Sequence, residues 1–301
     1  MERSLDEMQD FLTERNIKYR KDVSFKKISF LKLGGICPLV VYPRSESEFS
    51  AALLKARGLR VKFKVVGRMS NILPPDGIFA GVLISTSLMN HISAEGTLVR
   101  AECGCSLPAL SSYLAKNSLS ATEELSGIPA SVGGAIYMNA GAYGREICDV
   151  LSSVRVFDMN ASVFRELHKN ELDFSYRHSV FQDSEMYVAS AAFDTRRLPS
   201  GAIYEKISKL SAKRRANQPL TLPSLGSVFK RSNGISAAAL IDECGLKGYC
   251  IGGAAISEKH AGFIVNRGGA TAADYRKIVE IAKAAVFDSF GVKLEEEIEY
   301  L

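Results

Sequence analysis

The sequence predicts an α+β fold, and two observations support this class. From about residue 200 onward, three helix candidates alternate with short apolar strands. Before residue 200, strand-like segments are separated by segments that carry helix-capping residues. A mixture of this kind is typical of α+β modules.

The first elements are predicted by apolar spacing and by capping residues. Residues 6–16 form an amphipathic helix candidate, and residues 39–42 a short strand. Ser45 and Glu48 have the spacing of a capping box, which predicts a helix that ends near Arg57.

The middle of the chain is richer in strands. Ser106 is expected to cap a helix over residues 107–117, which Pro108 would start. Cys103 and Cys105 are expected to share one face of a strand that begins at Leu98, and therefore to be buried. Other strands are predicted over residues 61–66, 79–84, 150–157 and 186–193.

The turn at residues 196–201 is followed by a shift to helix-forming residues, so a domain boundary is expected near residue 200. The elements predicted beyond it are helices over residues 203–216, 236–244 and 271–290 and strands over residues 263–265 and 294–300.

Composition indicates a globular protein of two or three domains. The chain has 301 residues, of which 47% are hydrophobic and 24% charged. The first residues are too polar for a secretory signal, and no apolar run reaches the ~18 residues that span a membrane. We therefore expect a cytoplasmic protein that does not enter a membrane. The net charge of +5 suits a small anionic ligand but is too dispersed to indicate nucleic acid.

Cysteines and histidines give no sign of a metal site. The six cysteines include no CxxC pair, and the four histidines show no metal-ligand spacing. Scattered cysteines of this kind are expected to be reduced thiols.

A charge-free stretch at residues 125–144 is the strongest functional signal. Five of its residues are glycine, and glycine lets a ligand approach the backbone closely. Consecutive N–H groups without side chains can bind a pyrophosphate. The alternative is a glycine-rich turn that is packed for shape alone.

A second glycine segment, residues 67–71, follows the predicted strand at 61–66. A strand that runs into a Gly/Ser/Asn turn is a common way to present N–H groups to phosphates. The GxGxxG pattern is absent and no helix is predicted to follow, so a nucleotide site outside the Rossmann class is expected.

Three further segments carry candidate chemistry. Ser227 follows a glycine, and its hydroxyl is a candidate proton donor or a plain turn residue. Arg177 is a candidate clamp for a carboxylate, or an ordinary surface arginine. If residues 294–300 form a strand, alternation places Glu295 and Glu297 on one face.

Seven motifs in order resemble the UDP-N-acetylenolpyruvoylglucosamine reductase family. They lie at residues 29–35, 67–71, 125–144, 176–179, 223–230, 252–254 together with 259–266, and 290–297. The resemblance covers nearly the whole chain, and its motifs together are far more specific than any single one. The stretch between Arg177 and Arg214 is too short for the additional tyrosine loop of the longer family subtype, so the chain resembles the second, loop-less subtype.

The resemblance implies a fold of the vanillyl-alcohol-oxidase type, with two α+β subdomains for non-covalent FAD and a C-terminal α+β substrate domain. The expected ranges are 1–65, 66–199 and 200–301. It also implies that NADPH reduces the flavin and that the enolpyruvyl ether of UDP-N-acetylglucosamine is then reduced to UDP-N-acetylmuramate, a peptidoglycan precursor. A monomer without nucleic-acid or membrane partners is expected.

The resemblance also assigns roles to individual residues. Arg177 and Glu297 match the pair at the substrate carboxylate, and Ser227 matches the residue that protonates C2. Beside a carboxylate, Glu297 is expected to be protonated, because a like charge raises its pKa. The substrate residues are Tyr176, Arg215, Lys230 and His260. The FAD residues are Gly67, Arg68, Met69, Ser70, Asn71, Ser126, Gly127, Ile128, Ser131, Gly133, Gly134, Ala135, Asn139 and Ala140.

Three positions depart from the family pattern. Met69 stands where the family usually has a glycine, Leu225 replaces a common alanine, and Gly262 stands where asparagine is frequent. A side chain at position 69 would crowd a pyrophosphate unless it points away.

Two other functions are compatible with the glycine segments. An FAD oxidase of the same fold would not need Arg177, Ser227 and Glu297 together, and many such oxidases bind FAD covalently, for which Cys148 is the nearest candidate. A flavin-binding regulatory module would bind the cofactor without turnover.

Overall fold

The computed structural model describes residues 2–232 and 234–301. Its contacts divide the chain into two compact units. Unit 1 comprises the described residues of 1–21, 39–68 and 80–212, and unit 2 those of 22–38, 69–79 and 213–301. The division into three domains at residues 65/66 and 199/200 stays a prediction.

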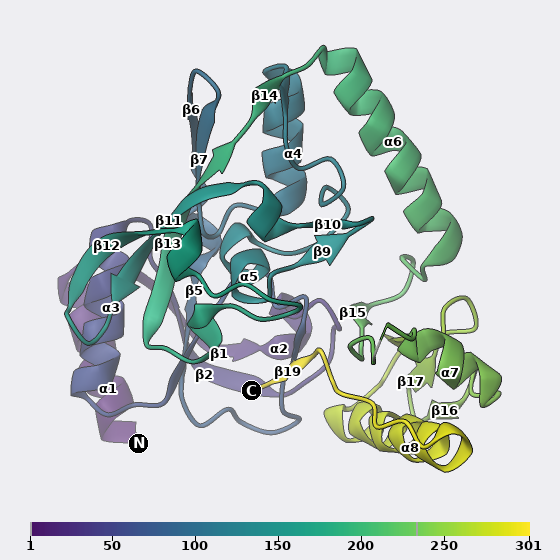
Figure 1. Cartoon of the computed structure of the whole chain (residues 1–301). Coiled ribbons are helices and arrows are strands. Elements are labelled where there is room, and N and C mark those ends of the chain that lie inside the picture. Colours follow the sequence, from purple (N-terminus) through teal and green to yellow (C-terminus); the bar gives the residue numbers. More distant parts are fainter. Residues whose placement is uncertain (1, 233) are drawn as a thin grey trace. The chain divides into compact units, whose positions relative to one another are not determined.

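Unit 1 is built around a four-stranded sheet and a five-stranded sheet (Figure 1). The first sheet has the order β1-β2-β5-β3, in which β2 and β3 each pair in parallel with β5. The second has the order β12-β11-β13-β7-β6 and is antiparallel throughout. The strands are β1 Lys18–Ser24, β2 Ile36–Tyr42, β3 Phe63–Val66, β5 Val82–Ser85, β6 Ile92–Glu95, β7 Leu98–Glu102, β11 Leu151–Asp158, β12 Val163–His168 and β13 Met186–Asp194.

The helices of unit 1 cover these sheets, and two short strand pairs complete it. Helix α1 packs on α3, and α5 packs on β13 and β7. The helices are α1 Glu2–Glu14, α3 Glu46–Gly58, α4 Leu107–Lys116, α5 Val132–Tyr137 and α6 Ser200–Asn217, which continues into unit 2. The short strands are β8 Leu119–Ser120, β9 Gly141–Ala142, β10 Arg145–Glu146 and β14 Arg196–Arg197, and the 3-10 turns are η1 Thr86–Leu88, η2 Ile147–Asp149, η3 Lys169–Glu171 and η4 Val180–Gln182.

Unit 2 contains an antiparallel sheet of order β15-β18-β17-β16, on which helix α8 packs. A separate parallel pair joins β4 to β19. Its elements are α2 Phe25–Ile28, β4 Ile72–Leu73, β15 Ser224–Ser227, α7 Ala237–Glu243, β16 Cys250–Ile251, β17 Ala254–Ile256, β18 Phe263–Asn266, α8 Ala272–Phe290 and β19 Glu299–Tyr300.

Each unit has its own hydrophobic core. In unit 1 the core joins the inner faces of α1, α3 and α4 to both sheets. In unit 2 it surrounds α8, with Tyr275 fully buried. Leu225 belongs to this second core, where its side chain is 3% exposed, so the replacement of the family's alanine adds buried apolar volume.

Local capping explains where the principal helices begin. Ser106 Oγ accepts a hydrogen bond from Ala109 N at 3.2 Å, which starts α4 as predicted. At α3, Ser45 Oγ accepts from Glu48 N at 3.2 Å. The second half of the predicted box is wrong, because the Glu48 carboxylate accepts from Arg44 N instead, at 2.9 Å.

Several element boundaries differ from the prediction. The first helix spans α1 rather than residues 6–16, and the strand predicted at 79–84 begins only at Val82. Cys103 and Cys105 lie in the turn after β7 rather than on a strand, although both are buried as expected. All six cysteines are free thiols.

The strand predicted over residues 294–300 is reduced to β19. Glu296 forms only an isolated bridge with Phe229, and the chain then pairs with β4. The segment thus exchanges one partner for another within a few residues. The prediction that Glu295 and Glu297 lie on one face of a single strand is therefore wrong.

Candidate active site

Gly67 and Ser131, one residue from each glycine segment, are in direct contact within unit 1. Gly67 directly follows β3, and Ser131 is the residue before α5. A Cβ atom placed on Gly67 would lie 1.9 Å from Ser131 Oγ, so no side chain fits there. The structure therefore brings together the two segments from which the sequence predicts a phosphate site.

The expectation that all glycine N–H groups are open is wrong for two positions. Gly133 N donates to Cys103 O at 2.8 Å, and Gly134 N donates to Ser131 Oγ at 3.2 Å. A Cβ on Gly133 would lie 3.0 Å from Cys103 Cβ. These glycines permit close packing of α5 on the turn after β7. At these two positions the structure agrees with the alternative that the glycines serve packing.

A buried carboxyl group precedes the charge-free stretch. Glu123 is 3% exposed, and its Oε1 has no hydrogen-bond partner among the described residues. Ser126 Oγ donates to the main-chain oxygen of Glu123 at 2.7 Å. Since a buried polar atom without a partner is costly, this position suits a polar ligand.

Met69 occupies its glycine-type position in a left-handed conformation. Its φ is 51°, and the residue is 4% exposed. A left-handed backbone is the conformation that glycine adopts without strain, which explains why the family prefers glycine here. The buried side chain offsets that strain. Arg68 beside it is exposed, and Ser70 is half-buried.

Arg177 is held in a strained turn of unit 1. Its φ is 57°, and the flanking residues Ser175 and His178 form an isolated bridge. Gln182 Nε2 donates to Arg177 O at 3.0 Å and to Tyr137 O at 2.9 Å, which ties this turn to α5.

The Arg177 guanidinium contacts main-chain oxygens and one carboxylate. Nη1 donates to Asn139 O and Nη2 to Gly141 O, both at 3.4 Å, and Glu146 Oε1 lies 3.7 Å from Nη1. With its side chain 15% exposed, Arg177 is a fixed cation rather than a freely moving surface arginine.

Asn139 connects this cation to the charge-free stretch. It is fully buried, and its Nδ2 donates to Glu146 Oε2 and to Ser175 O, both at 2.9 Å. Its side chain thus holds both the turn and the carboxylate that flank Arg177. Its expected contact with FAD stays a prediction.

Ser227 and Glu297 lie on neighbouring segments of unit 2. Ser227 ends β15, follows the left-handed Gly226 (φ 82°) and is exposed. Its hydroxyl donates to Phe229 O at 3.3 Å. Val228 O, one residue along, accepts a hydrogen bond from Glu297 N at 2.8 Å. The structure therefore brings these two predicted catalytic residues together, while Arg177 belongs to unit 1.

The predicted substrate residues have defined surroundings. Tyr176 is 44% exposed, and its ring centroid lies 4.9 Å from Arg177 Cζ. Lys230 Nζ forms an ion pair with Glu295, and Arg215 is exposed near the end of α6.

His260 explains the glycine at position 262. Its Nδ1 accepts a hydrogen bond from Gly262 N at 3.2 Å, and its ring packs on Phe263 at 4.8 Å. A Cβ on Gly262 would lie 3.1 Å from both His260 Cε1 and Ala238 Cβ. Any side chain at 262 would therefore displace one of these neighbours.

Residues that act through others could not be identified from the sequence. Glu146, Gln182 and Glu123 carried no local signal, because their partners lie in other segments of unit 1. Ser179 belongs to the predicted 176–179 cluster, and its Oγ donates to Tyr137 O at 2.7 Å.

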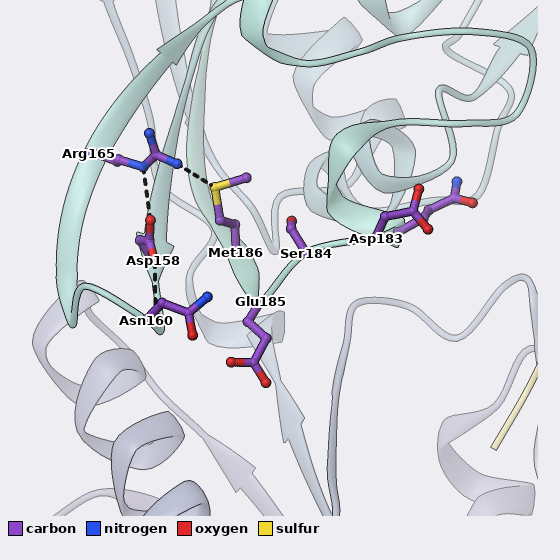
Figure 2. Close-up of a pocket in the computed structure, with 8 residues that line it drawn as sticks. Asp158, Asn160, Arg165, Asp183, Ser184, Glu185 and Met186 are labelled. Atoms are coloured by element: carbon purple, nitrogen blue, oxygen red, sulfur yellow. Dashed lines mark hydrogen bonds and ion pairs between the residues drawn. The ribbon is translucent and has the colours of Figure 1, made fainter.

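A separate hollow of about 650 Å³ lies in unit 1 and contains none of the predicted site residues. Arg165 Nε lies 3.2 Å from Asp158 Oδ2, and its Nη2 contacts Met186 Sδ at 3.0 Å (Figure 2). The charge of this arginine is therefore already paired. The hollow is lined by Asp158, Asn160, Arg165, Gln182, Asp183, Ser184, Glu185 and Met186.

Within residues 2–232 and 234–301, no cluster of three or more His, Cys, Asp or Glu side chains has an arrangement that could hold a metal ion. Over the same residues, no helix has the length and apolar character needed to cross a membrane.

Comparison with known proteins identifies both parts of the chain. Residues 218–301 match the C-terminal domain of UDP-N-acetylenolpyruvoylglucosamine reductase, and residues 37–166 match an FAD binding domain. The UDP-N-acetylenolpyruvoylglucosamine reductase of Caldicellulosiruptor saccharolyticus is 39% identical over 292 residues, covering 96% of this chain and 94% of that protein. The protein of the same name from Latilactobacillus sakei is 40% identical over 295 residues, covering 98% and 97%.

Solved structures agree with these matches. The crystal structure of this reductase (MurB) from Thermus caldophilus aligns with a TM-score of 0.80 at 31% identity, covering 94% of this chain and 98% of that one. Berberine bridge enzyme from Eschscholzia californica aligns with a TM-score of 0.50 at 14% identity, over 64% of this chain and 44% of that one, a likeness of fold alone. The predicted flavoprotein fold is confirmed. Since the similarity extends over nearly its whole length, the chain belongs to the UDP-N-acetylenolpyruvoylglucosamine reductase family.

Proposed function

We propose that Arg177, Ser227 and Glu297 carry the reaction of this chain, the NADPH-dependent reduction of the enolpyruvyl ether of UDP-N-acetylglucosamine to UDP-N-acetylmuramate. Family membership supports the reaction and the use of FAD. The product belongs to peptidoglycan precursor synthesis.

The residues present fit FAD as the cofactor. The close contact between Gly67 and Ser131 brings the main chains of the two glycine segments together, and the buried Glu123 Oε1 is an acceptor without a partner among the described residues. When FAD is bound, it supplies the hydride that it takes from NADPH and that C3 of the enolpyruvyl group receives. The protein itself binds and orients the cofactor and the substrate, and it supplies the proton.

Each of the three residues has one task. Arg177 would hold the substrate carboxylate through two N–H groups, for which its fixed position is suited. Glu297, when protonated, would donate a hydrogen bond to the enolate that forms as C3 accepts the hydride. Ser227 would then give its hydroxyl proton to C2. Its exposed hydroxyl, one residue from the contact with Glu297, is the observation that carries the proposal.

Non-covalent attachment of FAD is supported by the state of Cys148, the thiol that lies just beyond the charge-free stretch. Burial, together with Asp149 and Glu146, raises the pKa of Cys148. A raised pKa lowers the thiolate fraction and hence the reactivity of the group. Cys148 is therefore a poor candidate for the covalent link of an FAD oxidase.

We further propose a cytoplasmic monomer, without nucleic-acid or membrane partners. NADPH and UDP-sugars are substrates found inside the cell, and the mild net charge of +5 suits nucleotide anions.

The test follows the visible spectrum of purified protein loaded with FAD. We expect NADPH to bleach the flavin bands and the enolpyruvyl substrate to restore them without oxygen. Acid precipitation should release the flavin into solution. A protein whose flavin stays oxidised with NADPH would be a binding module, and flavin retained in the precipitate would indicate a covalent oxidase.

A further inference from the structure

A continuous row of hydrogen bonds in unit 2 runs through Val228, the residue after Ser227, and through Glu297. Val228 N, next to Ser227, donates to Gly262 O at 2.9 Å. Val228 O accepts from Glu297 N at 2.8 Å. Glu297 O in turn accepts from Asn71 Nδ2 at 2.8 Å, so the last step of the row is made by a side chain.

Asn71 is well placed to hold this end of the row. Its own main-chain oxygen accepts a hydrogen bond from Glu299 N at 2.9 Å. Directly beyond it, Ile72 and Leu73 pair in parallel with Glu299 and Tyr300. The asparagine side chain thereby extends the pairing of β4 with β19 back to Glu297.

The consequence for Glu297 is geometric. Both peptide groups that flank its Cα are held, the N–H by Val228 and the C=O by Asn71. Because the direction of the Cα–Cβ bond is set by these two groups, the starting point of the Glu297 side chain is fixed. Without Asn71, the carbonyl would be released, while the N–H would still be bound.

We infer that Asn71 is a positioning residue for Glu297, in addition to its place in the predicted flavin segment. This inference rests on the proposed role of Glu297. It also implies a coupling, because residues 67–71 form one loop and a cofactor bound there would restrict the residue that holds Glu297. Asn71 acts through Glu297 and need not touch the substrate.

The chemistry of the side chain is specific. A carbonyl oxygen needs a donor, which the asparagine amide supplies. Aspartate has nearly the same shape, but when ionised it only accepts hydrogen bonds and would repel the Glu297 carbonyl. A misplacement of about 1 Å at a reacting group can lower a rate about 100-fold.

The experiment compares the half-reactions of Asn71→Ala and Asn71→Asp at saturating FAD. Because Asn71 also lies in the predicted flavin segment, flavin reduction by NADPH is measured in the same variants as the reference, and reoxidation is expected to lose more than reduction does, since Glu297 has no task in the reduction. Flavin reoxidation by the enolpyruvyl substrate should fall about 10- to 100-fold in both variants, since Glu297 is displaced. The control is Asn117→Ala, at the end of α4. It removes an equivalent hydrogen bond from a side-chain amide to a main-chain oxygen, which Asn117 Nδ2 donates to Tyr113 O at 2.8 Å. It should leave both half-reactions unchanged.

A double-variant cycle separates this inference from the proposed function. Asn71→Ala should cost much less when Glu297 is already alanine, because its effect passes through that side chain. If Glu297→Ala itself reoxidises normally, the role of Glu297 is wrong. If Glu297→Ala is slow but Asn71→Ala reoxidises at the wild-type rate once saturated with FAD, only the positioning role is overturned. If Asn71→Ala lowers the reoxidation rate by the same factor whether residue 297 is glutamate or alanine, the positioning role is overturned as well.

Discussion

The turn around Arg177 and the hydrogen bonds of its guanidinium fix the position of this side chain. The left-handed backbone at Arg177 costs conformational energy, and two hydrogen bonds from Gln182 Nε2 offset it by tying the turn to Tyr137. The guanidinium then rests on main-chain oxygens of residues 139 and 141. A side chain whose position is set beforehand loses less entropy when it binds a carboxylate.

Ser227→Ala should lose overall turnover while NADPH still reduces the flavin. The hydroxyl is assigned only to the protonation of C2, and loss of such a proton donor typically costs about 10²- to 10⁴-fold. The two half-reactions are measured separately by stopped-flow absorbance. If reduction by NADPH collapsed to the same degree, Ser227 would instead contact the cofactor or support the fold.

Glu297→Ala should be more damaging than Glu297→Gln, because the amide can still donate a hydrogen bond. Loss of one preorganised donor costs about 3–4 kcal/mol of transition-state stabilisation. Single-turnover reoxidation by the enolpyruvyl substrate measures the difference. A normal rate in Glu297→Ala, together with a large loss in a Glu295 or Glu296 variant, would move the role to a neighbouring acid.

The neighbouring acids have structural partners, so they are not neutral controls. Glu295 pairs with Lys230, itself a predicted substrate residue. Glu296 pairs with Lys283 at 2.7 Å and accepts a hydrogen bond from the Tyr300 hydroxyl. Substitution at either position is therefore expected to disturb the 295–300 segment without removing the enolate donor.

At the scale of elements, α8 shows how local and distant residues together begin one helix. Thr271 Oγ1 accepts from Asp274 N, and the Asp274 carboxylate accepts from Thr271 N, both at 3.0 Å, which is a capping box within the helix's own segment. The N–H groups of Ala272 and Ala273 are satisfied by Asp76, at 2.6 and 3.0 Å. At the other end, the left-handed Gly291 terminates the helix.

Asp76→Ala should lower the free energy of unfolding of unit 2 by about 1 kcal/mol, the usual cost of losing a helix cap. Asp76→Asn should lose less, because its amide oxygen still accepts one N–H while the favourable charge at the helix N-terminus is gone. Urea unfolding followed by far-UV circular dichroism gives both values. Equal stability of wild type and Asp76→Ala would mean that water replaces the carboxylate without loss.

At the scale of the whole molecule, pH acts on stability through His260, the half-buried imidazole of unit 2. Burial, and to a smaller degree Lys247, lowers the pKa of His260 below its ordinary value of 6.5. Above pH 6.5 the ring is neutral whether the chain is folded or unfolded. Below that value the unfolded chain binds the proton first, so the folded state loses stability until the pH reaches the lowered pKa.

His260→Asn should therefore flatten the pH dependence. Its amide oxygen can accept the hydrogen bond from Gly262 N, but it does not titrate. We expect the free energy of unfolding of wild type to decrease more steeply than that of the variant as the pH falls from 6.5 to 5. Thermal or urea unfolding at several pH values measures this, and parallel curves would show that His260 does not contribute.

Local signals in the sequence determined much of the fold. The caps at Ser45, Ser106 and Thr271 depend on residues three positions apart, so helices α3, α4 and α8 could be predicted from neighbouring letters. Strands such as β5 and β13 show as mostly apolar runs. The ordered motifs identified the flavoenzyme family, because each reflects a local backbone requirement combined with a specific side chain.

Tertiary structure decided which groups meet across large separations in the sequence. Asn71 holds a carbonyl 226 residues away, and Asp76 caps a helix that begins 196 residues later. The segment 294–300 had the pattern of one strand, but two different partners divide it. Met69 adopts a left-handed, glycine-type conformation while its side chain is buried. Such outcomes depend on hydrogen bonds and packing between distant segments, and these have no trace in the local order of residues.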